Sequence, residues 1–439
     1  MGNIIQYIKE YGKYSFLEMP LNEVDSLVLS QMVYMNYAPF VPGMQERNAP
    51  VSIQSIYEHP DKEKILDDYW FRESNMELFT QAATSARFGT LKMNYYVNVI
   101  NLESETQFSA MTFVLEDKNV YIAFRGTDAT LVGWKEDLNL AFSKPLRSQQ
   151  LAVEYMEKVA AYIGGDFYMG GHSKGGNLAV YAAMNCSDIT RNSLLQVYNH
   201  DGPGFRPEIR QMGKYGEVAE RIHKFVPRSS VVGMILEDHE DYEIIESRSI
   251  GAFQHNVYSW KIKEDHFVRV ESRTASNLFR DRTLNEWILS LTEEEAHSFI
   301  DTFYGVVTAS QASSIFEFGT DWKKCLTGMI EAAKEVDEET RKVIQKILKS
   351  LFEIMSERAA VELTERAAGL TERAAEKAAM ITEKATEKAA EITEKREDYK
   401  RRLVLANKKR KSKKKKNKEE MIEAAKENEE FGGEESDGK

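Results

Sequence analysis

A serine between two pairs of glycines is the side chain whose setting most directly indicates chemistry. Residues 170–176 read GGHSKGG, which places Ser173 at the centre of a G-x-S-x-G pattern. Between a strand and a helix, such glycines allow a strained turn that lifts the serine hydroxyl out of the sheet. The sequence DFYMGGHS before the turn is typical of a short buried strand, and KGGNLAVYAAMNC after it is typical of a helix. We therefore predict that Ser173 is a nucleophile.

A serine hydroxyl is a weak nucleophile at neutral pH and needs a base, commonly a histidine oriented by a carboxylate. The histidines that follow it in the chain are His200, His223, His239, His255, His266 and His297. The first two and the last belong to predicted strands or a helix, and the third lies in an acidic turn, EDHED. His255 lies in an irregular segment and is our choice for the base, with His266 next.

The elements around Ser173 must place it at the edge of a sheet. NVYIAFRGTD at 119–128 and LLQVYNHDGPGF at 194–205 are typical of strands that run into glycine turns. LRSQQLAVEYMEKVAAYIG at 146–164 is an amphipathic helix closed by glycine, and ERIHKFVP at 220–227 is another strand. Strands that alternate with helices predict an α/β fold with a mostly parallel sheet covered on both faces. Residues 283–356 are predicted to be helical.

Several motifs together resemble a known family. FRGT followed by a W-x-x-D-L pattern, within 122–140, resembles the oxyanion strand and loop of class 3 lipases. VYNHDGPGF, VPRSSVVG, FQHNVYSW and the stretch at 16–37 extend the likeness. Over roughly residues 10–355, the chain resembles an uncharacterised bacterial family of lipase-like α/β-hydrolases related to class 3 lipases.

The resemblance implies a fold and a set of site residues. It implies an α/β-hydrolase sheet in which the hydroxyl residue after FRG, here Thr127, contributes to the oxyanion hole. The second oxyanion donor is the backbone N–H of the residue after the nucleophile, here Lys174. The family's histidine loop, a His followed by an aromatic pair, corresponds to FQHNVYSW and supports His255 as the base.

The acid departs from the family pattern. In class 3 lipases it follows the strand that corresponds to 220–227, but here that place reads SSVVG, and serine cannot supply a negative charge. We choose Asp201, because catalytic groups in open α/β sheets gather at the carboxyl ends of strands. The plainer interpretation is that Asp201 only caps the DGPG turn. Glu237 and Asp238 are the other candidates for the acid.

The predicted triad of Ser173, His255 and Asp201 indicates a serine hydrolase that cleaves acyl esters, an esterase or lipase, through an acyl-enzyme. A thioesterase or an acyltransferase would use the same residues. The competing hypothesis is a non-catalytic hydrolase fold that serves as an interaction or scaffold protein. It is supported by the serines at the usual place of the acid, whereas the intact glycine turn and FRGT motif count against it. The sequence contains no metal cluster, phosphate loop or nicotinamide fingerprint, so we predict no cofactor.

Composition limits the compartment and the partners. The 439 residues include 42% apolar residues, enough for a sizeable core, and the net charge of −12 counts against nucleic-acid binding by the whole chain. Two cysteines cannot form a disulfide framework and indicate a reducing compartment. We see neither a secretory signal nor a transmembrane run. We therefore expect a cytoplasmic protein.

The composition changes near residue 355, after which there is no proline or tryptophan and Ala, Glu, Lys and Thr dominate. We predict a lipase-like domain at 1–355, a long amphipathic helix at 356–407 and a disordered tail, basic and then acidic, at 408–439. The helix carries an 11-residue repeat marked by Leu370, Ile381, Ile392 and Leu403. Eleven residues make about three helical turns, so the apolar stripe stays on one side.

This C-terminal part has three open interpretations. It is an exposed spacer, a helix that lies on an anionic membrane surface, or a self-association segment. Similar 11-residue repeats with Thr and Ala occur in lipid-droplet and desiccation-tolerance proteins. The block KKRKSKKKKNK at 408–418 has nine basic residues in eleven and would add attraction to anionic lipid or to phosphates of nucleic acid. The acidic residues that follow it could mask this block.

Overall fold

The computed structural model describes most of the first 273 residues and only single positions or short runs after them. The described residues are 2–46, 49–66, 71–101, 103–127, 136, 139–140, 145–237, 242–273, 281, 285, 288–289, 338, 342, 408–409, 412–413 and 416–422. The chain divides into two compact units, Met1–Arg358 and Ala359–Lys439.

The first unit is built on a sheet of eight strands that follow one another in chain order. The strands β1 to β4 pair in antiparallel fashion, and β4 to β8 pair in parallel. The sheet is therefore mixed, with a parallel half that confirms the predicted α/β arrangement. The strands are β1 Val51–Ser52, β2 Lys92–Asn101, β3 Thr106–Val114, β4 Val120–Phe124, β5 Phe167–His172, β6 Leu194–His200, β7 Ile222–Pro227 and β8 Glu243–Ile245, with a separate pair β9 Ile262–Lys263 and β10 His266–Phe267.

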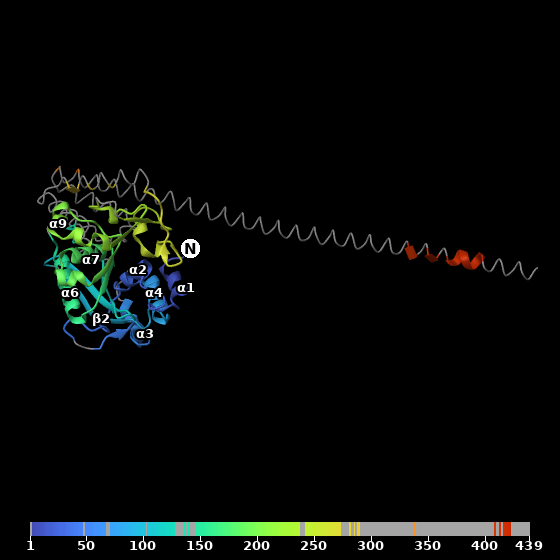
Figure 1. The fold of residues 1–439 in the computed structure, drawn as a ribbon, viewed down its shortest axis with the longest axis horizontal. Helices are drawn as coiled ribbons and strands as arrows, with labels where there is room; N and C mark the ends of the chain where they lie inside the picture. Colours follow the sequence, from blue (N-terminus) through green and yellow to red (C-terminus); the bar gives the residue numbers. More distant parts are fainter. Residues whose placement is uncertain are drawn as a thin grey trace, which may run out of the picture. The chain divides into compact units, whose positions relative to one another are not determined.

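Helices cover both faces of this sheet, and Figure 1 shows α6 and α7 on the side opposite α1, α2 and α4. The α-helices are α1 Ile4–Tyr11, α2 Glu23–Met32, α3 Ile53–Tyr57, α4 Arg72–Thr84, α6 Arg147–Ile163, α7 Lys174–Asn185, α8 Asp188–Asn192, α9 Pro207–Met212 and α10 Tyr215–Val218. The 3-10 turns are η1 Lys62–Leu66, η2 Ala219–Arg221, η3 Val232–Met234, η4 Gly251–His255 and η5 Val257–Ser259.

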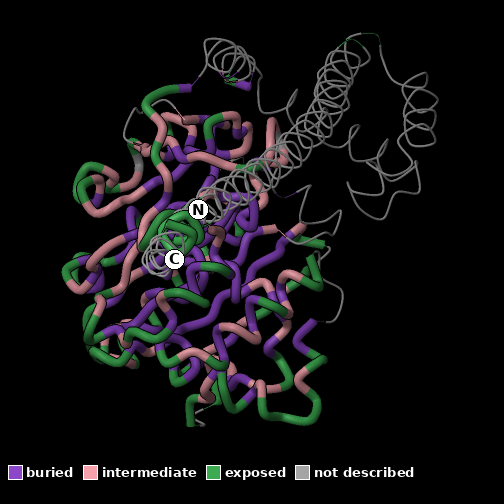
Figure 2. The backbone as a smooth tube through the Cα atoms, turned by 90° about the vertical axis from the view of Figure 1, so that its right-hand side faces the viewer, coloured by how far each residue is buried: buried purple, intermediate pink, exposed green. Residues whose placement is uncertain are grey.

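The alternation of side chains along the strands divides the core into two layers. On β4, Val120, Ile122 and Phe124 pack with α6 and α7, whereas Tyr121 and Ala123 pack with α1, α2 and α4. All five residues of β4 are buried, as expected of a strand in a parallel sheet that is covered on both faces. Figure 2 shows this buried backbone running through the middle of the first unit, with exposed segments around it.

The register of the parallel strands brings the predicted site to the carboxyl ends of β5 and β6. His172, the last residue of β5, pairs with His200, the last residue of β6, and His200 pairs with Phe225 on β7. Phe124 at the end of β4 pairs with Gly171. The residues that follow these strands, including Ser173 and Asp201, therefore begin side by side.

The predicted element limits agree closely with the structure near the site. The helix expected at 146–164 is α6, and Gly164 closes it in the left-handed conformation with φ of 63°. The segment 194–205, predicted as a strand that runs into a glycine turn, is β6 up to His200, and Asp201 begins the turn with φ of 56°. The helical prediction for 283–356 and the repeat helix at 356–407 fall almost wholly outside the described residues.

In the second unit, the described residues between 408 and 422 are helical and exposed. This differs from the disordered tail that we predict for 408–439. The basic block meets acidic residues at its end, and Lys416 forms an i,i+4 ion pair with Glu420 at 3.9 Å, which supports a helix there. Within the described parts of the chain, no helix has the length and apolar character to cross a membrane.

Candidate active site

Ser173 lies in a strained turn between β5 and α7. Its φ of 59° and ψ of −131° are unusual for a residue with a side chain. The turn is possible because glycines flank it: a Cβ on Gly171 would lie 2.2 Å from the carbonyl carbon of Gly175. A Cβ on Gly175 would lie 2.1 Å from the carbonyl oxygen of Phe124. The G-x-S-x-G pattern thus lets α7 begin directly against β4 and β5.

Asp201 and His255 form the direct contact between two of the predicted site residues. The Nδ1 of His255 lies 2.6 Å from the Oδ2 of Asp201. Asp201 is fully buried and follows β6, whereas His255 ends the η4 turn and its side chain is 25% exposed. Because a carboxylate only accepts hydrogen bonds, Nδ1 carries the proton. In the neutral imidazole, Nε2 is then the nitrogen that keeps its lone pair, as a general base requires.

Ser230 is one of the two serines at the place where the family pattern has its acid, and it contacts the predicted acid, Asp201. Its hydroxyl donates to the Oδ2 of Asp201 at 2.7 Å, and its side chain is fully buried. Arg273 donates to the backbone carbonyl of Ser230 at 2.7 Å and fixes it. Gly233 approaches from the same segment, since a Cβ there would lie 2.2 Å from the Oδ1 of Asp201. The segment after β7 therefore encloses the Asp201 carboxylate.

The backbone beside each predicted oxyanion donor approaches Ser173. A Cβ on Gly126 would lie 3.2 Å from the Cβ of Ser173, so the loop after β4 contacts the nucleophile one residue before Thr127. Lys174 is the first residue of α7. The first N–H groups of a helix have no acceptor within it, so this N–H is available to a ligand. Lys174 is thus next to Ser173 in the chain, and Gly126, the residue before Thr127, is next to Ser173 in space.

His172 has a larger part in the site than its sequence position indicates. As the residue before Ser173 it is expected to point away from that serine and to be packed, and the structure buries it with its ring 4.4 Å from the ring of His255. Its Nε2 lies 2.9 Å from the carbonyl oxygen of His255, and its Nδ1 lies 3.2 Å from the hydroxyl of Tyr34. Burial, and then the neighbouring His255, lower the pKa of His172 well below its usual value. His172 is thus neutral, and its Nε2–H donates to His255.

Tyr34 and the His172–His255 contact are the parts of the site that sequence reasoning missed. Tyr34 follows α2, and no pattern around it indicates a role in the site. It reaches His172 because α2 packs against β5. A signal for His172 was present, since the residue before the nucleophile is the last one on its strand, but its partner lies 83 positions away in the sequence.

The other candidate histidines have partners away from Ser173. The Nε2 of His200 lies 2.8 Å from the Ser26 hydroxyl in the core, and burial lowers the pKa of His200 to about 3. His223 stacks on Tyr198, and the Nδ1 of His266 lies 3.2 Å from Asp265. His239 and His297 fall outside the described residues.

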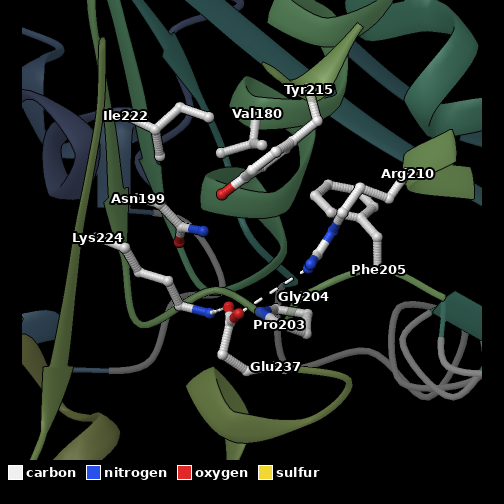
Figure 3. A pocket seen from close by; sticks show the side chains of 10 residues that line it. All are labelled: Val180, Asn199, Pro203, Gly204, Phe205, Arg210, Tyr215, Ile222, Lys224 and Glu237. Carbon is white, nitrogen blue, oxygen red and sulfur yellow. Dashed lines mark hydrogen bonds and ion pairs between the residues drawn. The ribbon is translucent and has the colours of Figure 1, made fainter. Parts of the chain in front are cut away.

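The alternative acid Glu237 is occupied elsewhere. Its carboxylate forms a close ion pair with Lys224 and lies 3.9 Å from the guanidinium of Arg210. Figure 3 shows the three charged side chains meeting at the wall of a small pocket. Asp238 falls outside the described residues. Among the described carboxylates that we considered, Asp201 is therefore the one in contact with His255. No group of three or more metal-ligating side chains occurs in that same described part of the chain.

The sheet and the turn at Ser173 define an α/β-hydrolase fold of the lipase-like kind. The chain belongs to the Mbeg1-like family, whose model matches residues 82–305, just over half of the chain. The predicted resemblance to a lipase-like family is thereby confirmed. Tyr34 lies outside the matched residues.

Solved structures of lipases are among those similar to this chain. The Rhizomucor miehei lipase propeptide complex, a deletion mutant, is 15% identical with a TM-score of 0.32, over 48% of this chain and 81% of that one. M37 lipase is 12% identical with a TM-score of 0.31, over 49% and 69%. The lipase from Rhizopus microsporus var. chinensis is 14% identical with a TM-score of 0.28, over 56% and 88%. Scores of this size carry no argument about activity. No curated protein matches the chain.

Proposed function

We propose that the protein is a serine hydrolase that cleaves acyl esters, with Ser173 as nucleophile, His255 as base and Asp201 as acid. The observation that carries the proposal is the 2.6 Å contact between Asp201 and the Nδ1 of His255. It is made at the edge of the sheet where Ser173 occupies its strained turn. A buried carboxylate that holds one tautomer of a partly exposed histidine is the arrangement that activates a serine.

In the proposed acylation, the Oγ of Ser173 attacks the carbonyl carbon of the ester while its proton passes to the Nε2 of His255. The carbonyl electrons move to the oxygen, and the oxyanion accepts hydrogen bonds from Thr127 and from the backbone N–H of Lys174. Asp201 stabilises the imidazolium without taking its proton. The intermediate collapses when Nε2–H protonates the leaving alcohol, and the acyl group stays on Ser173.

Deacylation repeats these steps with water. His255 takes a proton from the water, whose oxygen attacks the acyl carbon, and returns that proton to the Oγ of Ser173 as the acid leaves. Thioesters would react through the same residues, and an alcohol in place of water would give acyl transfer. Assays with esters and thioesters would distinguish these substrate classes.

The geometry also weakens the alternative of a non-catalytic scaffold. That hypothesis depends on serines at the family's acid position, and Asp201 supplies a carboxylate to His255 from the neighbouring strand. A strained backbone at Ser173 costs on the order of 1–3 kcal/mol. A protein without a use for the Ser173 hydroxyl gains nothing from that cost.

The test is covalent labelling of the full chain with a fluorophosphonate probe, which reports an activated serine without knowledge of the substrate. We expect the wild-type protein to be labelled and Ser173→Ala to remain unlabelled, with short-chain nitrophenyl esters hydrolysed in the same pattern. A wild-type protein that resists the probe, or a Ser173→Ala protein that is still labelled, would contradict the proposal.

Recruitment to anionic membrane surfaces through residues 356–418 is a second part of the proposal. Its support is the exposed basic side chains of the described helical positions, such as Lys413, Lys416 and Lys418. Each basic residue near an anionic surface contributes about 1 kcal/mol. Co-sedimentation of the full chain with phosphatidylserine vesicles should exceed that with neutral vesicles, and the triple Lys→Gln change should reduce it. Equal sedimentation with both would favour a spacer, and sedimentation without vesicles would favour self-association.

A further inference from the structure

The side chain of Lys174 is buried, although lysine at the start of a helix normally reaches solvent. It is 1% exposed, and its ammonium donates to the carboxylate of Glu136 at 2.7 Å. It also donates to the backbone carbonyl of Gln107 at 3.0 Å. The side chain of Lys174, the residue after Ser173, is therefore anchored in the protein interior by an ion pair and a hydrogen bond.

Glu136 joins three parts of the site region. Its Oε2 accepts from Lys174 on α7 and also from the backbone N–H of Gln107 on β3, at 2.9 Å. Glu136 itself belongs to the chain that follows Thr127 and is 2% exposed. Nearby, Asn139 donates to Glu105 at 3.2 Å. The chain beyond the FRGT motif is thus fastened to the start of α7 and to β3 at described positions.

Stability alone does not explain this ion pair. Removing two charges from water costs several kcal/mol per ion, and apolar replacements of buried pairs are often neutral or stabilising. What the pair does fix is position. The first turn of α7 lies against β4 where Gly175 meets the backbone of Phe124. The Lys174–Glu136 ion pair adds a second point of attachment to this turn. Lys174 carries the N–H that the proposed mechanism needs as an oxyanion donor.

We propose that the buried Lys174–Glu136 ion pair is a positioning device for the oxyanion hole, which holds the Lys174 N–H and the chain after Thr127 in a fixed relation. This inference rests on the proposed function. It assigns Lys174 two separate roles: its backbone N–H touches the oxyanion, and its ammonium sets where that N–H points. Oxyanion donors act only when they are preorganised at the developing charge.

The chain offers a matched control. Lys224 and Glu237 form a second buried Lys–Glu pair, with side chains 6% and 8% exposed, between β7 and the segment after η3. Figure 3 shows this pair at the wall of a small pocket, together with Arg210. It has the same chemistry and similar burial, but it includes no residue of the proposed mechanism.

The experiment compares Lys174→Met/Glu136→Gln with Lys224→Met/Glu237→Gln by the second-order rate of fluorophosphonate labelling and by melting temperature. Glutamine at 136 keeps an acceptor for the Gln107 N–H while both charges are removed. We expect the first double variant to label roughly 10- to 100-fold more slowly, below the full effect of losing an oxyanion donor. We expect the control variant to label within about threefold of wild type, because it changes no residue of the proposed mechanism and acts only through stability.

Labelling of Lys174→Met/Glu136→Gln at the wild-type rate would overturn the inference while leaving the proposed function intact. A wild-type protein that is not labelled at all would overturn both. If the double variant does not fold, Glu136→Asp decides. That variant keeps both charges but shortens the reach of the carboxylate, so several-fold slower labelling at an unchanged melting temperature is expected, and the wild-type rate would refute the positioning role.

Discussion

At the end of β5, Ser173 is held by its own backbone, whereas at the end of β6, Asp201 is held by side chains from distant parts of the chain. The turn at Ser173 depends on Gly171 and Gly175 within two residues of it. Asp201 depends on Ser230 and His255, which lie 29 and 54 positions further along. The conformation of Ser173 therefore depends on neighbouring residues in the sequence, whereas the contacts of Asp201 come from residues that the fold brings together.

The difference explains which side can vary without loss of the site. A strained turn with close backbone contacts leaves little choice of residue at the positions around Ser173. A carboxylate needs only to reach the Nδ1 of the histidine, and neighbouring parallel strands end close together. The hydroxyl of Ser230, after β7, lies 2.7 Å from the Oδ2 of Asp201, after β6. A carboxylate at the end of either strand could therefore come close to the histidine.

The largest effect that tests the acid side is expected from Asp201→Asn. The amide keeps the size of the side chain but removes the charge and favours the wrong tautomer of His255, so ester hydrolysis should fall roughly 10³- to 10⁴-fold. The measurement is kcat/KM on a nitrophenyl ester beside the melting temperature. Glu237→Gln is the control and should change kcat/KM little. Activity of Asp201→Asn near the wild-type level would place the acid elsewhere.

A second prediction exchanges the acid between the two strand ends. Asp201→Ser alone should be as inactive as Asp201→Asn, and the double change Asp201→Ser/Ser230→Asp should recover on the order of 10- to 100-fold. The reason is that the Ser230 hydroxyl already lies within hydrogen-bonding distance of the Asp201 carboxylate. No recovery in a folded double variant would show that only the end of β6 supports the acid.

The local signals around Ser173 could be predicted from the sequence, whereas the long-range contacts of Asp201 could not. The strand, turn and helix around Ser173 follow from local glycines and a buried apolar run, and the structure has them at Phe167–His172 and Lys174–Asn185. The parallel half of the sheet follows from alternating strands and helices. Asp201 follows from the rule about strand ends, but its contact with Ser230 and the ring contact between His172 and His255 depend on long-range packing. The buried Lys174–Glu136 pair was unforeseen, because lysine and glutamate are normally solvated.

The residues before Ser173 and before Asp201 allow a third test, which concerns stability. His172 and His200 end their strands as a pair, and burial lowers the pKa of both. For His200, with a pKa of about 3 against an ordinary value of 6.5, the unfolded chain binds the extra proton as the pH falls. The stability that neutral His200 contributes is full above pH 6.5 and declines between pH 6.5 and 3.

Between pH 7.5 and pH 5, this decline should amount to about 2 kcal/mol for His200. Between the same two pH values, the free energy of unfolding of His200→Gln should therefore fall by about 2 kcal/mol less than that of the wild-type protein, whatever its value at pH 7.5. Urea denaturation at both pH values measures the difference, and the contribution of His172 cancels because both proteins contain it. Equal pH dependence of the two proteins would mean that His200 is protonated in the folded state.

The smallest expected effect concerns the support of the acid itself. Ser230→Ala removes one of the hydrogen bonds to the Asp201 carboxylate, and a net contribution of about 1 kcal/mol to its orientation corresponds to a roughly three- to tenfold lower kcat/KM. The His255 contact stays in place, so the loss must be far below that of Asp201→Asn. Ser229→Ala, on the adjacent residue, is the control, because the backbone N–H of Ser229 donates to the Oε1 of Gln254 and alanine keeps that contact. If Ser230→Ala and Ser229→Ala behave alike, the Ser230 hydroxyl does not orient the acid, and only His255 links the acid side to catalysis.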